Sequence, residues 1–127
     1  ASRGMESPDI WRHMIDRDGA VGAENLVRLL FSCSNGERPD GLLITDDNLV
    51  THATRGLAAT GLSIPDDVDV IAHTNFPLAP ESAIPVKRLG YDIEAVLRRC
   101  VEYIDSRREG KNPADIIEIA PVFEEEL

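Results

Sequence analysis

The sequence predicts an α/β fold built on a mainly parallel sheet, and three observations lead to this prediction. First, helix and strand patterns alternate along the chain in the order helix, strand, helix, strand, loop, strand, helix, strand, which is typical of parallel α/β sheets. Second, two of the strand patterns are short apolar runs, as expected for strands that are buried between helices. Third, the chain has 127 residues, which is enough for one domain with a core but hardly for two.

The first apolar run lies in the central stretch of the chain, residues 38–48. Residues 42–44 (Leu-Leu-Ile) predict a strand that is buried on both faces. A helix should follow and end at Gly61, because apolar residues recur there at helical spacing, namely Val50, Ala53, Leu57 and Ala58. Asp46 and Asp47 stand between this strand and this helix. An Asp there can cap the helix, but open α/β sheets also bind ligands at this edge, so both explanations stay open.

The residues before this stretch contain a second amphipathic helix. Residues 10–15 are compatible with a strand or with a short helical turn, and Trp11 and Met14 are expected to be buried there. From Gly22 onwards the apolar residues recur at helical spacing, as Ala23, Leu26, Val27 and Leu30, which predicts a helix. Residues 34–36 (Ser-Asn-Gly) form its stop signal.

Beyond the central helix, residues 68–73 predict a second parallel strand. Two polar residues, Thr74 and Asn75, mark its end. A loop with three prolines is expected over residues 76–85, and a weak strand over residues 86–91.

The clearest helix of the chain follows this weak strand and ends at Gly110. Its wide apolar stripe must pack on something substantial and consists of Ile93, Val96, Leu97, Cys100, Val101 and Ile104. A last strand is predicted over residues 115–120. The tail with Glu124–Glu126 is expected to be solvated.

Composition and charge exclude several classes of function. The net charge is −10 and the pI is near 4.6, whereas binding a phosphate backbone needs a basic face. No membrane span or signal peptide is visible. Cys33 and Cys100 lie among apolar residues, which predicts reduced, buried thiols rather than a disulfide or a metal pair. No metal or cofactor motif is found, since the histidines lack neighbours at zinc-ligand spacing, namely His13, His52 and His73.

The sequence gives little support for an enzyme. Asp46 and Asp47 could in principle work as an acid and a base. Consecutive residues at a strand-to-helix junction point in different directions, however, which makes them a poor catalytic pair. No nucleophile–base constellation and no Gly-rich phosphate loop is present. We therefore expect a binding module.

Four segments of the chain resemble the LacI/GalR family of bacterial transcriptional regulators. They are RPDGLLITDD (residues 38–47), RGLAATGLSIPDDVDVIAHTN (55–75), IPVKRLGYDIEAVLRRCVEYI (84–104) and NPADIIEIAPVFEE (112–125). The similarity runs from about Asp16 to the end of the chain, and GLSIPDDVDVI is its most specific part. Periplasmic solute-binding proteins of sugar transport systems share the fold but have a looser version of this phrase, so they are the alternative.

The resemblance implies a three-layer α/β sandwich of the periplasmic-binding-protein-like kind, with a small-molecule effector, a sugar or related polar metabolite, in a cleft between two subdomains. Family members are usually cytoplasmic homodimers. Residues 1–127 would be part of the effector-binding domain, namely its C-terminal subdomain only. The N-terminal subdomain and the DNA-binding headpiece are expected to be absent, so that operator DNA would be bound only through that missing headpiece.

The resemblance also implies effector contacts at Asp46 with Asp47, at Thr74 with Asn75, and at Arg17. Thr74 and Arg17 depart from the family, which commonly has Asp and an aromatic residue there. Thr cannot accept hydrogen bonds from two adjacent hydroxyls as a carboxylate does, which argues against an ordinary pyranose. Two alternatives stay open, namely a smaller, aminated or anionic effector and a site that has lost its ligand. In the alternative, Thr74 and Asn75 only bond their own loop, and Arg17 pairs with nearby acids, namely Asp16, Asp18 or Glu24.

The resemblance also implies a partner surface for the helix predicted over residues 92–108. In the family, this helix packs on the subdomain that this chain is expected to lack. Its apolar stripe would then face water and favour self-association, by domain swapping or by pairing of helices.

Overall fold

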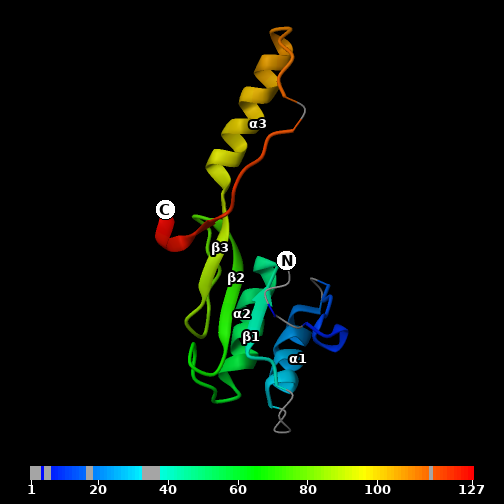
Figure 1. Cartoon of the computed structure of the whole chain (residues 1–127), viewed down its shortest axis with the longest axis vertical. Helices are drawn as coiled ribbons and strands as arrows, with labels where there is room; N and C mark the ends of the chain where they lie inside the picture. The colour runs from blue at the N-terminus through cyan, green and yellow to red at the C-terminus, as the bar shows by residue number, and fades with distance from the viewer. Residues whose placement is uncertain (1–3, 5–6, 17–18, 33–37, 115) are drawn as a thin grey trace.

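The computed structural model describes the chain except residues 1–3, 5–6, 17–18, 33–37 and 115. Four strands form one sheet in the order β1-β2-β3-β4. They are β1 (Gly41–Ile44), β2 (Asp69–Phe76), β3 (Lys87–Asp92) and β4 (Val122–Phe123). β1, β2 and β3 run parallel, and β4 pairs antiparallel with β3 (Figure 1). The predicted α/β class with a mainly parallel sheet is confirmed.

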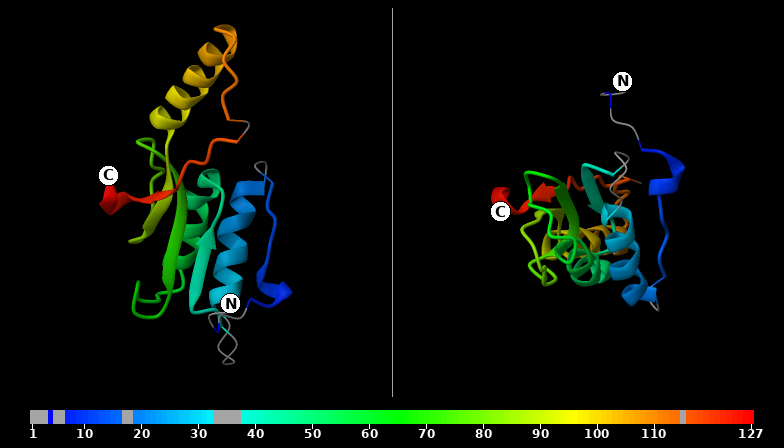
Figure 2. Two further views of the ribbon diagram at one scale, coloured as in Figure 1. Left: turned by 45° about the horizontal axis from the view of Figure 1, so that its top comes forward. Right: turned by 90° about the horizontal axis from the view of Figure 1, so that it is seen from below.

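Helices α1 (Ala20–Ser32) and α2 (Asp47–Ala58) pack on each other and cover one face of the sheet (Figure 2). Both helices are amphipathic, as predicted. The buried residues of α1 are Ala23, Val27 and Phe31, which recur every four residues and so share one side of the helix. The core between the two helices and the sheet consists of Val27, Phe31, Ile44, Val50, Ala53, Leu57, Val68, Val70 and Ala72. Each large aliphatic or aromatic side chain in it contributes roughly 1.5–3 kcal/mol through burial.

The side chains of β2 alternate strictly between the two faces of the sheet. Those on the helix-covered face are fully buried, namely Val70, Ala72, Thr74 and Phe76. The strand is also longer than predicted, because it does not end at His73 but continues to Phe76. The reason is that β3 extends alongside it, with Thr74 opposite Gly90 and Phe76 opposite Asp92.

The opposite face of the sheet is not covered by α1 or α2. Leu43 of β1 is 65% exposed. On the same side of the neighbouring strands, His73 and Tyr91 are partly exposed, with ring centroids 6.3 Å apart. The prediction that residues 42–44 form a strand buried on both faces is therefore wrong. Only one helical layer packs on this sheet in the described part of the chain, so alternate apolar residues face solvent.

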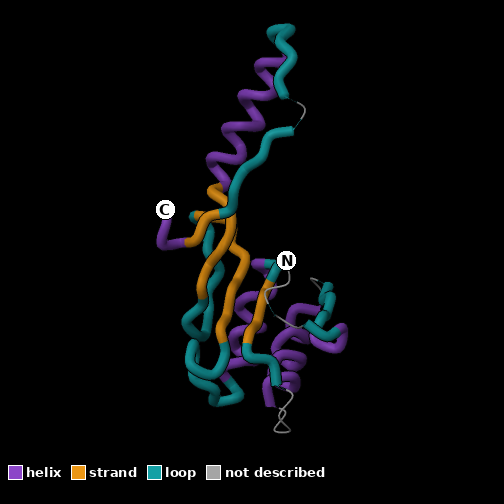
Figure 3. Tube along the Cα trace, viewed as in Figure 1, coloured by secondary structure: helices purple, strands orange, loops and turns teal. Residues whose placement is uncertain are grey.

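Helix α3 (Ile93–Arg108) begins directly after β3 and extends away from the sheet (Figures 1 and 3). Asp92 caps it, because its Oδ1 accepts hydrogen bonds from the backbone N–H groups of Glu94 and Ala95 at 3.0 and 3.2 Å. No residue of α3 is buried. In this chain, α3 therefore does not add the third layer of the expected sandwich over the sheet.

The position of α3 corrects the prediction for Cys100. The cysteine was expected to be buried and is instead a free, exposed thiol, because the helix face that carries it does not lie on a core. Cys33 lies outside the described residues.

The C-terminal strand also differs from the prediction. Residues 115–120 were expected to form it, but the described residues of this segment have no strand structure, and Ile116 and Ile117 are exposed. The segment runs back beside α3, away from the edge of the sheet (Figure 1). Pairing starts only at Val122, where the chain reaches β3. The tail then ends in a short 3₁₀ helix, η3 (Glu124–Glu126).

At the other end of the chain, the first regular element is a single 3₁₀ turn, η1 (Asp9–Trp11), which agrees with the short helical turn. Trp11 is partly buried, but Met14 is fully exposed, so the prediction of burial is wrong for Met14. The segment runs beside α1 on the side away from the sheet, where little surface can cover it (Figure 2). The stop signal predicted at residues 34–36 lies outside the described residues.

Candidate functional site

Four polar side chains come together where β1 and β2 end and α2 begins. They are Asp46, Asp47, Asn48 and Asn75. β1 and β2 are parallel neighbours, so their carboxyl ends meet at one edge of the sheet, which is where open α/β sheets bind ligands. We call these four residues the polar edge cluster.

Asp46 holds the first turn of α2. It is the N-cap residue, with an extended backbone (φ −120°, ψ 120°). Its Oδ1 accepts hydrogen bonds from the backbone N–H and the side-chain Nδ2 of Asn48, at 3.0 and 2.8 Å. The sequence left capping and ligand contact open for this residue, and the structure shows that Asp46 caps the helix. The side chain is partly exposed, so capping does not remove it from the surface.

Asp47 links the first turn of α2 to the end of β2. Its Oδ2 accepts a hydrogen bond from Nδ2 of Asn75 at 2.7 Å, and its Oδ1 accepts one from Nδ2 of Asn48 at 3.2 Å. Asp47 and Asn75 are 28 residues apart in the sequence. Asn75 lies on the face of β2 that the helices leave open. The structure therefore brings together three of the predicted site residues: Asp47 bonds Asn75 directly, and Asn48 links Asp47 to Asp46.

Thr74 has a different environment from the one expected. It was predicted as an effector contact at the end of the strand, but it lies inside β2 and is 0% exposed. The alternation of the strand turns it toward the helix-covered face, while Asn75 points to the other side. Its Oγ1 is buried and has no hydrogen-bond partner among the described residues. In this structure solvent does not reach Thr74.

This orphan hydroxyl leads to a testable expectation. A buried hydroxyl without a partner costs about 1–3 kcal/mol, and Val has nearly the same shape as Thr. We expect Thr74→Val to raise the free energy of unfolding by about 1 kcal/mol, measured by urea denaturation followed by circular dichroism. Thr54→Val is the matched control, because the hydroxyl of Thr54 is equally buried but bonds the carbonyl of Val50 at 2.7 Å. A loss of stability in Thr74→Val as large as in this control would show that the Thr74 hydroxyl is satisfied.

One further residue was predicted for this site, and three residues near this edge of the sheet were not predicted. Arg17 lies outside the described residues, so its predicted role stays a prediction. Asn48, Tyr91 and Asp92 were not selected from the sequence. Tyr91 and Asp92 end the third parallel strand, with Tyr91 in register with Asn75, and the rule that selected Asp46 would have selected them too. Asn48 could have been recognised as a polar residue in the first turn of the predicted helix.

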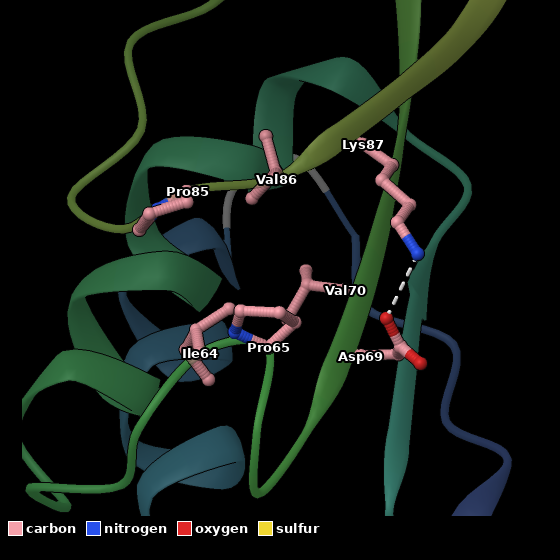
Figure 4. Close-up of a pocket in the computed structure, with 7 residues that line it drawn as sticks. All are labelled: Ile64, Pro65, Asp69, Val70, Pro85, Val86 and Lys87. Atoms are coloured by element: carbon pink, nitrogen blue, oxygen red, sulfur yellow. Dashed lines mark hydrogen bonds and ion pairs between the residues drawn. The ribbon is translucent and has the colours of Figure 1, made fainter.

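An apolar pocket of about 150 Å³ lies at the opposite end of the sheet (Figure 4). Asp69 and Lys87, the first residues of β2 and β3, form an ion pair of 3.0 Å at its rim. The other lining residues are Ile64, Pro65, Val70, Pro85 and Val86. The cavity therefore belongs to the amino ends of the strands and is separate from the polar edge cluster.

The polar edge cluster is suited to bind hydrogen-bond donors. Two carboxylates and two amide groups supply mostly acceptor oxygens, and a carboxylate has about four acceptor sites. Hydroxyl and ammonium groups are the natural ligands for such a surface. Nowhere in the described ranges do three or more His, Cys, Asp or Glu side chains come together in a way that could hold a metal ion. The described helices also include none that is long and apolar enough to cross a membrane.

Comparison with known proteins agrees with this fold. Residues 1–122 match the family described as periplasmic binding protein-like domain. The lactose operon repressor of Rhizobium radiobacter is 28% identical over 75 residues, which are 59% of this chain and 66% of that protein.

Solved structures of a LacI family transcriptional regulator from Lactobacillus casei share the fold, each with a TM-score of 0.63. One contains bound Tris and is 19% identical, and another contains bound glucose and is 18% identical. Both matches cover 83% of this chain but only 37% of the regulator, so this chain spans less than two fifths of the solved proteins. The chain belongs to the family of periplasmic binding protein-like domains.

Proposed function

We propose that this chain is the effector-sensing and dimerisation region of a LacI-type transcriptional regulator. It binds a small polar molecule in a cleft between two subdomains, and binding changes the affinity of the full-length, cytoplasmic protein for its operator. Residues 1–127 supply one wall of that cleft as a partial effector domain. Contacts to DNA come from a headpiece outside this chain, which agrees with a net charge of −10 here.

The observation that carries this proposal is the hydrogen bond between Asp47 and Asn75. It fixes a carboxylate and an amide side by side at the carboxyl edge of a parallel sheet, where ligands of such sheets bind. Both residues are partly exposed, so the bond orders polar groups at the surface and is not part of the core. An ordered polar surface loses less side-chain entropy when it binds a ligand.

The chemistry of the cluster selects the class of effector. With Asp46 and Asp47 on one edge, the surface is rich in acceptors and negatively charged, so it favours neutral polyols and cationic amino alcohols over anions. The solved regulators of the same fold contain glucose or Tris, and both molecules carry several hydroxyl groups. We infer a small polyhydroxylated effector, with or without an amino group. The relatives that this chain matches are a repressor and a regulator. This supports a chain that binds its effector without catalysis.

Titration by ¹H–¹⁵N NMR tests this proposal on the chain itself, in a buffer free of Tris. We expect glucose or Tris at millimolar concentrations to shift the amide signals of residues 46–48 and 75, including the side-chain amides of Asn48 and Asn75. Asp47→Asn keeps the shape but removes the charge, and should weaken binding about tenfold, because hydrogen bonds to charged groups contribute about 1.5–3 kcal/mol.

The matched control is Asp69→Asn, which makes the same chemical change at the opposite end of β2. It should leave the titration unchanged. Replacing Asp46 by Ser, which is also a good cap, separates the effect of its charge from the effect of capping. If neither molecule shifts these signals, or if both Asn variants weaken binding equally, the polar edge cluster is not the effector site.

A further inference from the structure

The apolar pocket at the amino ends of β2 and β3 has two walls that come from connecting segments (Figure 4). Ile64 and Pro65 of the connection between α2 and β2 form one wall, and Pro85 and Val86, directly before β3, form the other. Val70 points toward them from β2 (Figure 4). We propose that this pocket binds a neutral apolar molecule of about six carbon atoms. This binding site is separate from the proposed effector site.

The lining and the size of the pocket select this class of ligand. The side chains of its two walls and of Val70 are aliphatic and supply no hydrogen bonds. A water molecule needs two to four polar partners, so water in this pocket is poorly bound, and an apolar group gains affinity by displacing it. An aliphatic cavity of about 150 Å³ can hold a molecule of the size of benzene.

The wall that contains Pro65 is held in place by two hydrogen bonds. The backbone N–H of Ser63 donates to Oδ2 of Asp67 at 2.8 Å, and the backbone N–H of Asp67 donates to the carbonyl of Ser63 at 2.8 Å. Between these bonds, the ring of Pro65 fixes its own φ angle. The turn therefore keeps its shape without a ligand.

The wall that contains Pro85 belongs to a loop that is fastened to α2. The backbone N–H of Ala83 donates to Oγ1 of Thr54 at 3.1 Å, and Oγ1 of Thr51 donates to the carbonyl of Glu81 at 2.9 Å. Both walls are thus fixed by contacts within the chain. A pocket that is already formed loses less entropy when a ligand enters it.

The charges at the rim favour a neutral ligand. Asp69 and Lys87 pair with each other at 3.0 Å, so an ionic ligand would have to compete with this contact. The position of the rim also separates the pocket from the effector site. Asp69 stands six residues before Asn75 on β2, which is about 20 Å along the strand. Ligands at the two sites can therefore be tested independently.

Methyl ¹H–¹³C NMR of the 127-residue chain tests the site, with 1-propanol, 1-butanol, 1-pentanol and benzene as probes. We expect saturable shifts of the methyl signals of Ile64, Val70 and Val86, and competition between benzene and 1-pentanol. Affinity should rise about fourfold for each methylene group added along the alcohol series. The methyl signals of Val21, which is 64% exposed on α1, should not move. Shifts that do not saturate, or equal shifts at Val21, would overturn the proposal.

Two variants locate the bound molecule. Val86→Phe should fill the pocket and weaken benzene binding at least about tenfold, whereas Val21→Phe adds the same ring on α1 and should have no effect. Asp67→Ala removes a bond that holds one wall and should weaken binding several-fold. It leaves the pocket volume intact, so it tests the site even if Val86→Phe does not fold. Asp66→Ala, at the neighbouring carboxylate, is its matched control.

The glucose titration separates this proposal from that of the effector site. Val86→Phe and Asp67→Ala should leave the shifts that glucose causes at residues 46–48 unchanged, and Asp47→Asn should leave benzene binding unchanged. Benzene binding that persists in a chain without a glucose response supports the pocket and contradicts only the effector site. Benzene binding that is equally tight in the wild type, in folded Val86→Phe and in Asp67→Ala would show that the molecule lies elsewhere, and would refute the proposal.

Discussion

Replacing Gly90 by Ala is expected to lower the free energy of unfolding by roughly 3 kcal/mol or more, the upper part of the range for overpacking. A Cβ at this position would collide with the backbone carbonyl of Thr74 on the neighbouring strand. Backbone atoms of a paired strand cannot rotate away as the end of a side chain can, so β2 and β3 would have to separate. The measurement is urea denaturation followed by far-ultraviolet circular dichroism.

The control for this variant is Gly41→Ala in β1. A Cβ there would meet its nearest neighbour, the carbonyl oxygen of Asp69, at 3.8 Å, which is an ordinary contact. Ala in a strand interior is favoured over Gly by roughly 0.5–1 kcal/mol, so this variant should equal or slightly exceed the wild type. If Gly90→Ala behaved in the same way, the close approach of β2 and β3 at Thr74 would be contradicted.

The same contact matters for the proposed effector site. Gly90 lets β3 approach Thr74, and the next residue of β2 is Asn75, which bonds Asp47. Separation of the two strands would therefore shift Asn75 away from the start of α2. We therefore expect Gly90→Ala to disrupt the hydrogen bond between Asn75 and Asp47 as well as to lower the free energy of unfolding.

A second large loss of stability is expected for Gly56→Ala, at the contact between α1 and α2. On intrinsic helix propensity alone, this change should stabilise α2 by about 1 kcal/mol. A Cβ at Gly56, however, would collide with the backbone carbonyl of Glu24 on α1. The helices would have to move apart, and the core residues between them, including Leu57 and Val27, would lose contacts. We expect a net loss of about 2–3 kcal/mol, within the usual range for overpacking.

Gly22→Ala provides the opposite result in the other helix of the pair. Gly22 lies inside α1, and a Cβ there would meet no atom within 4 Å. This variant should therefore gain the full benefit of Ala, up to about 1 kcal/mol. Thermal unfolding of both variants under identical conditions compares them directly. Equal shifts of the melting temperature in the same direction would show that α1 and α2 do not touch at Gly56.

Much of the fold could be predicted from local patterns because those patterns determine local structure. The spacing of Val50, Ala53 and Leu57 defined the buried side of α2, and Asp46 defined its start as a cap. The alternation of helices and strands predicted the parallel sheet. Family resemblance then predicted the periplasmic-binding-protein-like fold. These features depend on residues within a few positions of one another.

The errors in predicted burial share one physical cause, which is that apolar residues do not specify what covers them. Leu43, Cys100 and Met14 lie in apolar runs and were expected to be buried, yet each is exposed. A pattern shows which residues favour burial, but burial also needs a second surface. In the described chain, helices cover only one face of the sheet, and α3 does not lie on it.

The sequence by itself determined the fold class, the helices, and the position of Asp46 and Asp47 between a strand and a helix. Only the tertiary structure decided that Asp47 bonds Asn75, that Thr74 turns inward beneath them, and that Gly90 and Gly56 stand where two backbones meet. The reason is distance along the chain. Hydrogen bonds and steric contacts between residues about 16–32 positions apart depend on how whole elements pack, and no local periodicity encodes that packing.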